Sequence, residues 1–200
     1  MTETTTWSAA SRLLHWAIVL TITFQQATGL FMSDPGTQFL FPPHRYIGLV
    51  TGLVLLLFWL YSYAAYDLAL LFPWNRAAFR AIASEVLGLW RRRLPPPGRR
   101  AGLSSFVHGL GILAVSGCAV TGVVIHAMIP SGPPAPPQDP AAFTRYVLAH
   151  KFFADALWVY WAGHVGFALL HQLTGSNVFG SIFGRAGLTN DTSAGRDRRP

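Results

Sequence analysis

The chain has 200 residues, of which 52% are hydrophobic and 12% are charged, and its mean hydropathy is +0.36. Soluble domains contain about 25% charged residues, so this composition excludes an ordinary soluble enzyme and indicates a membrane protein. The net charge of +7 would suggest nucleic acid as the partner of a soluble protein. Here we expect membrane lipid and no nucleic acid, because the placement of the basic residues reports membrane topology.

Four stretches are long enough to cross the hydrocarbon core of a bilayer, which takes about 20 apolar residues. We place these spans at residues 11–32, 44–66, 101–129 and 146–173. Ser8 or Ser11 can cap the first helix, and Pro42 and Pro43 precede the second. The predicted fold is therefore an all-α integral membrane protein, a four-helix transmembrane bundle.

The segment between the second and third spans has a different pattern. Ala78, Ile82 and Val86 recur at helical spacing beside Arg76 and Arg80, which predicts an amphipathic helix on the cytoplasmic leaflet. The third span is rich in glycine and alanine, which let neighbouring helices approach closely. We expect a single transmembrane domain over residues 8–184 and a basic, disordered cytoplasmic tail over residues 185–200.

Basic residues are unevenly distributed between the two sides of these spans. Twelve of the 15 fall on the side of the termini and the middle loop: Arg12, Arg76, Arg80, Arg91, Arg92, Arg93, Arg99, Arg100, Arg185, Arg196, Arg198 and Arg199. Only Arg45, Arg145 and Lys151 fall on the other side. The positive-inside rule therefore predicts a multi-pass protein with both termini and the middle loop in the cytoplasm.

Seven histidines occur in a chain of this composition, and ionisable residues inside spans are costly and usually functional. His150 and His164 are fourteen residues apart, which brings both to one helix face within about 40° and separates them by roughly 21 Å along the axis. Two imidazoles at two depths suggest two haem irons, each bound by histidines from two helices. The only cysteine, Cys118, lies inside a span, so no C-x-x-C-H site exists and the haems are of the non-covalent b type.

The predicted topology sorts possible partners by depth. His15 and His108 lie at the cytoplasmic level of His164, and His44 and His126 at the outer level of His150. Because His108 and His126 are eighteen residues apart and share a face, spacing alone leaves the third span open as the source of ligands. His171, seven residues beyond His164, is a further alternative.

Four segments resemble the bacterial cytochrome b-561 family, which includes the cytochrome b subunits of nickel-iron hydrogenases. They are SRLLHW at 11–16, HRYIGL at 44–49, the third span with Thr121 and Gly122, and the histidine pair of the fourth span. The resemblance covers roughly residues 8–184. It implies that His15 pairs with His164 at a cytoplasmic haem and that His44 pairs with His150 at an outer haem. Arg12 and Arg45, beside two of these ligands, are candidate clamps for the haem propionates.

The resemblance implies a membrane-bound cytochrome of the bacterial cytoplasmic (inner) membrane that moves electrons across the bilayer, to or from the quinone pool, with a dehydrogenase or hydrogenase as possible partner. An alternative is a free-standing superoxide-to-quinone oxidoreductase, which Arg45, Arg145 and Lys151 favour because they would attract an anion from outside. A third, of another class, is a haem-free transporter or scaffold whose histidines bind a transition metal. The sequence identifies neither the electron donor nor the oligomeric state.

Overall fold

The computed structural model describes residues 8–65, 68–95, 102–129, 137–176 and 178–183. All the regular secondary structure in these ranges is helical and none of it is strand, so the all-α prediction is confirmed for them. The predicted tail at 185–200 lies outside the described residues. The four long helices are α1 (Ala9–Phe31), α2 (Phe41–Ala64), α5 (Leu103–Met128) and α6 (Pro140–Leu173). The short ones are η1 (Gln38–Leu40), α3 (Leu68–Leu71), α4 (Arg76–Trp90) and α7 (Val178–Phe183).

Three segments in the described part are long and apolar enough to cross a membrane: Gln38–Ala64, Leu103–Met128 and Pro140–Leu173. Helix α1 has 23 residues and is also long enough for a span. It contains His15, Gln25 and Gln26 together with three threonines, and these polar side chains lower its hydropathy. The chain is therefore a membrane protein with three clearly apolar helices.

Side-chain caps determine where several helices begin. The Ser8 hydroxyl oxygen accepts the Ser11 N–H at 3.0 Å at the start of α1, and Asn75 accepts the Ala78 N–H at 2.9 Å at the start of α4. Helix α6 begins at Pro140, earlier than the predicted residue 146. The reason is local, because the Asp139 carboxylate accepts the Ala142 N–H at 2.9 Å and proline suits the first helical position. Helix α2 likewise begins at Phe41, before residue 44.

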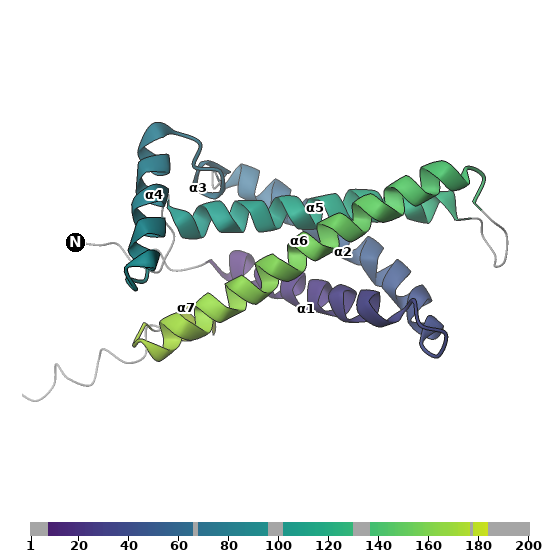
Figure 1. Cartoon of the computed structure of the whole chain (residues 1–200), viewed down its shortest axis with the longest axis horizontal. Coiled ribbons are helices and arrows are strands. Elements are labelled where there is room, and N and C mark those ends of the chain that lie inside the picture. The colour runs from purple at the N-terminus through teal and green to yellow at the C-terminus, as the bar shows by residue number, and fades with distance from the viewer. Residues whose placement is uncertain (1–7, 66–67, 96–101, 130–136, 177, 184–200) are drawn as a thin grey trace, which may run out of the picture.

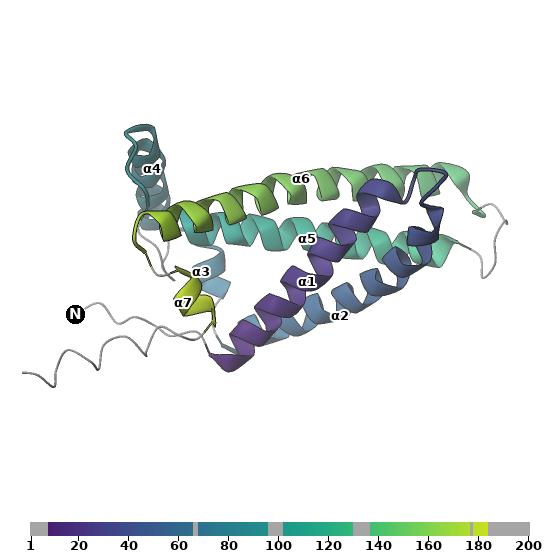
Figure 2. The same cartoon turned by 90° about the horizontal axis from the view of Figure 1, so that it is seen from below.

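The long helices form two antiparallel hairpins. Helix α1 packs on α2, α5 packs on α6, and α2 also packs on α5 (Figure 1). Hydrogen bonds also cross between the hairpins in the middle of the bundle: Trp59 Nε1 donates to Ser116 Oγ at 3.1 Å, and Gln26 Nε2 donates to the Ala154 carbonyl at 3.3 Å. Helix α4 stands across one end of the bundle, the end at which α1 begins and α6 finishes (Figure 2).

The buried core is a small apolar layer in the middle of the bundle. It contains Ile22, Leu55, Val115 and Leu157, one from each long helix. Leu157 is seven residues from both His150 and His164, so the layer lies halfway between the two predicted histidine levels. Large apolar side chains elsewhere point outward, as Val159 does at 77% exposure. This surface suits contact with lipid.

Helices α5 and α6 approach closely at two glycines. A Cβ atom built on Gly111 would lie 2.5 Å from the Tyr160 ring, and one built on Gly117 would lie 2.5 Å from the Phe153 ring. Both distances are far shorter than an ordinary carbon–carbon contact of about 3.5–4.0 Å. Glycine is therefore required at these positions for the two aromatic rings to pack against α5 as they do.

Candidate functional site

Two pairs of histidine rings face each other between the hairpins. His15 on α1 and His164 on α6 have ring centroids 6.5 Å apart, with their planes at 56°. His44 on α2 and His150 on α6 have ring centroids 6.4 Å apart, with their planes at 82°. Because His150 and His164 both belong to α6, this helix contributes one ring to each pair.

The spacing of both pairs fits two imidazoles that share one iron. A metal–nitrogen bond to imidazole is about 2 Å, and a nitrogen lies about 1.1 Å from the centre of a five-membered ring with bonds of this length. Two rings on opposite sides of one metal ion are thus about 6.3 Å apart, from centre to centre. The observed distances of 6.5 and 6.4 Å are close to this value. The donor chemistry, two neutral imidazoles on two helices, also suits the axial positions of a b haem.

His108 on α5 lies beside His164 at a different distance. Their ring centroids are 4.8 Å apart and the planes are at 88°. This separation is shorter than the roughly 6.3 Å that two rings across one metal need. The His108 Nδ1 lies 2.7 Å from the Ser104 carbonyl, to which it can donate. His108 is therefore arranged as a neighbour of His164, whereas His15 has the spacing of a partner.

Aromatic rings surround the pair formed by His15 and His164. Tyr160 stacks on His164 with ring centroids 5.5 Å apart and planes at 21°, and its ring meets His108 edge to face at 6.2 Å. Trp16 lies against His15 at 5.7 Å and stacks on Phe183 of α7 at 5.0 Å. Helix α7 thus covers the start of α1 beside this pair.

Threonine hydroxyls hold both rings of the other pair. Thr28 Oγ1 lies 2.9 Å from His44 Nδ1, and Thr121 Oγ1 lies 3.0 Å from His150 Nδ1. The side chain of Gln25 also donates to the His44 carbonyl at 3.0 Å. With Nδ1 engaged in each ring, Nε2 is the nitrogen left to bind a metal.

Arg45 contacts the other histidine of this end of the bundle. Its Nε donates to His126 Nδ1 at 2.7 Å, and its Nη2 donates to the His126 carbonyl at 3.4 Å. His126 is thus held by α2 and does not face His150 as a ring partner among the contacts of the described chain. Arg12 lies one turn before His15 on α1, and His171 lies in the last turn of α6. Cys118 is a free thiol that packs against the apolar layer.

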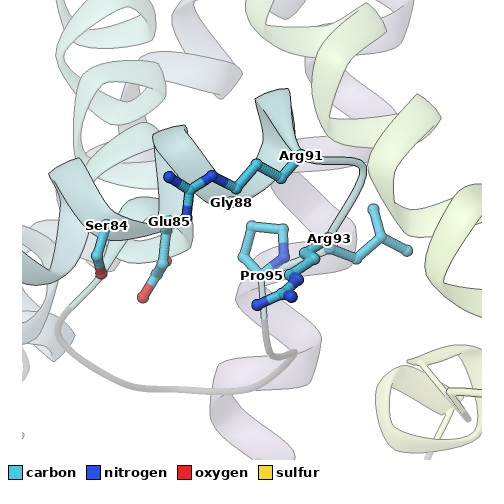
Figure 3. Close-up of a pocket in the computed structure, with 7 residues that line it drawn as sticks. Ser84, Glu85, Gly88, Arg91, Arg93 and Pro95 are labelled. Atoms are coloured by element: carbon cyan, nitrogen blue, oxygen red, sulfur yellow. The ribbon is translucent and has the colours of Figure 1, made fainter.

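A cavity of about 230 Å³ lies away from the histidine pairs, at the end of α4 (Figure 3). Its lining includes Ser84, Glu85, Gly88, Arg91, Arg93 and Pro95. The Glu85 carboxylate accepts the N–H of Leu103 at 3.0 Å, so it caps the beginning of α5. The cavity therefore belongs to the junction of α4 with α5.

A helical membrane protein with two pairs of facing imidazoles belongs to the class of proteins that can hold metal cofactors between their spans. The sequence profile of the family described as prokaryotic cytochrome b561 matches residues 6–185. The chain therefore belongs to the prokaryotic cytochrome b561 family, as its sequence suggested, and is a membrane protein of haem b electron transfer. No curated protein and no solved structure matches the chain. Membership supports b-type haem as the cofactor over the haem-free transporter or scaffold.

Three residues around the histidines had no role in our interpretation of the sequence: Thr28, Gly29 and Tyr160. The dipeptide Thr-Gly occurs at 28–29, 51–52, 121–122 and 174–175, so by itself it does not single out positions 28 and 29. Only the copy at 121–122 contributed to the resemblance to the family. Tyr160 carries no comparable signal, since an aromatic residue in an apolar helix is usually part of the packing.

Proposed function

We propose that the chain is a di-haem b-type cytochrome that carries electrons across the cytoplasmic membrane, to or from the quinone pool. The observation that supports this most directly is the spacing of the two histidine pairs, 6.5 and 6.4 Å between ring centroids. The pairs occupy two levels of α6 that are roughly 21 Å apart by helical rise. Two levels on one helix suit transfer across the bilayer better than transfer along one surface.

In this proposal His15 and His164 hold the cytoplasmic haem, and His44 and His150 hold the outer haem. A bound b haem supplies an iron that changes reversibly between its ferrous and ferric states. Imidazoles on both axial positions leave no open coordination site, which favours electron transfer over oxygen binding. Arg12 and Arg45 would face the propionates; Arg45 uses Nε and Nη2 for His126 and has further N–H groups for this purpose.

The same proposal includes the membrane arrangement. Helix α1 serves as the fourth span, and α4 lies on the cytoplasmic surface with exposed apolar residues such as Phe79 and Trp90 toward the headgroups. Both termini are then cytoplasmic, and residues 8–184 form one domain with a basic tail at 185–200. A dehydrogenase or hydrogenase subunit would donate or accept electrons at one face.

One observation favours a second candidate function, a free-standing superoxide-to-quinone oxidoreductase. Arg145 and Lys151 are exposed on α6 close in sequence to His150, and Arg45 directly follows His44. These cations are close in sequence to the outer pair and would raise the local concentration of a small anion such as superoxide. Reduction of the purified protein by superoxide, followed by reoxidation by quinone, supports this candidate. Reduction only in the presence of a protein donor supports the relay.

Haem stoichiometry tests the main proposal. The pyridine haemochrome assay should give two b haems per purified chain and one in each of the variants His164→Ala and His44→Ala. His108→Ala and His126→Ala are the matched controls, and both should keep two haems. Loss of a haem in a control, with none lost in the first two variants, would mean that the third long helix supplies the ligands.

A further inference from the structure

Both histidines of the outer pair are held by the same two-residue motif. Thr28 and Gly29 on α1 contact His44 on α2, and Thr121 and Gly122 on α5 contact His150 on α6. The motif lies on the first helix of each hairpin and the histidine on the second. The two hairpins thus present their rings to each other with equivalent supports.

We propose that Thr28 and Thr121 are positioning residues that set the chemical form and the orientation of the outer histidine pair, so that both Nε2 atoms point at a shared haem iron. This inference rests on the proposed function, since it takes His44 and His150 as haem ligands.

The position of each hydroxyl proton is the first argument. Thr28 Oγ1 donates to the Phe24 carbonyl at 2.8 Å, and Thr121 Oγ1 donates to the Gly117 carbonyl at 2.6 Å. A hydroxyl has one proton and can otherwise only accept. While its proton is on the backbone carbonyl, each threonine accepts from the histidine, and this arrangement places the single proton of a neutral imidazole on Nδ1. The lone pair of Nε2 is then available to the metal.

The space around the rings is the second argument. A Cβ atom on Gly29 would lie 3.4 Å from His44 Cε1, and one on Gly122 would lie 3.3 Å from His150 Cε1. Glycine after each threonine thus lets the imidazole lie close to the neighbouring helix, within reach of the hydroxyl. Thr28 and Thr121 are 5% and 7% exposed, so water cannot readily replace either hydroxyl as the acceptor.

These bonds should affect the basicity of each histidine ligand as well as the orientation of its ring. The chain of bonds from Nδ1–H to the hydroxyl and on to a backbone carbonyl is polarised along its length. An acceptor on the distal nitrogen raises the basicity of the ligating nitrogen and fixes the ring orientation. A more basic imidazole favours ferric over ferrous iron, so these threonines should lower the midpoint potential of the outer haem.

The test uses the full-length chain with His15→Ala, in which the outer haem titrates alone. Thr28→Val and Thr121→Val keep the shape of the side chain and remove the hydroxyl. Each should weaken haem binding by about 10- to 100-fold and raise the midpoint potential. The midpoint potential should rise by about 59 mV for every tenfold by which the substitution weakens the binding of ferric haem more than the binding of ferrous haem. Thr28→Ser and Thr121→Ser should restore both quantities, because serine keeps the acceptor.

Thr51→Val is the matched control. Thr51 is also buried, and its hydroxyl donates to the Ile47 carbonyl at 2.8 Å on α2, so the substitution removes a similar bond without touching either outer ring. The positioning role is overturned if Thr28→Val and Thr121→Val change haem binding and midpoint potential no more than Thr51→Val does. It is also overturned if the serine variants lose as much as the valine variants. If His44→Ala keeps both haems, the proposed function and this inference fail together. If the His15→Ala chain does not fold, the threonine variants are made in the chain that keeps His15. Each valine variant should then shift one of the two components of the haem titration and leave the other unchanged.

Discussion

Gly111→Ala should loosen the contact between α5 and α6 and disturb the inner histidine pair, His15 and His164. The added methyl group would lie 2.5 Å from the Tyr160 ring, about 1 Å inside an ordinary carbon–carbon contact. Overpacking of this kind costs about 1–3 kcal/mol, whereas replacing glycine by alanine within a helix contributes only about 0.5–1 kcal/mol of stability. We therefore expect a net loss of stability.

The same substitution should act selectively on one haem site, because Tyr160 stacks on His164 at 5.5 Å. Thermal unfolding in detergent, followed by circular dichroism, measures the stability, and redox titration shows which haem component changes. Gly163→Ala is the control, because a Cβ atom there meets nothing within 4 Å. If Gly111→Ala is as stable as Gly163→Ala, with both haem components unchanged, the close approach of Tyr160 to α5 is wrong.

Three further substitutions test other contacts. Leu157→Ala should lower the free energy of unfolding by about 2–5 kcal/mol, because it opens a cavity in the apolar layer. The same thermal unfolding measures this loss of stability, and a loss smaller than that of an exposed leucine variant would contradict the burial of Leu157. Trp59→Phe and Ser116→Ala should each cost roughly 0.6 kcal/mol, and the double variant should cost little more than either, since both remove one bond of 3.1 Å. Arg45→Gln should leave two haems per chain in the haemochrome assay and change the outer potential alone; an altered inner component would argue against its placement beside the outer pair.

The helices themselves were largely predictable, because their signals are local. The helical repeat of Ala78, Ile82 and Val86 lies within α4 (Arg76–Trp90), and Ser8 caps α1 as one of two expected candidates. The span placed at 146–173 lies within α6, which begins at Pro140 because Asp139 caps the helix there.

The choice among histidine partners depended on information that spacing along the chain does not contain. His15 and His108 share a predicted level with His164, and periodicity left both possible. The difference between 6.5 Å and 4.8 Å reflects how α1, α5 and α6 pack. Thr28 was missed, and Thr121 was noted only as part of a family motif, for a related reason. A back-bonded threonine in an apolar helix is common, and only the neighbouring helix shows what else its oxygen contacts.

The layer of Ile22, Leu55, Val115 and Leu157 has an electrical consequence. It separates the two histidine levels with hydrocarbon side chains, so most of the voltage across the membrane should fall over this thin, poorly polarisable slab. Each elementary charge that crosses the full voltage does about 2.3 kcal/mol of work per 100 mV. Electron exchange between the two levels would therefore sense the membrane potential directly.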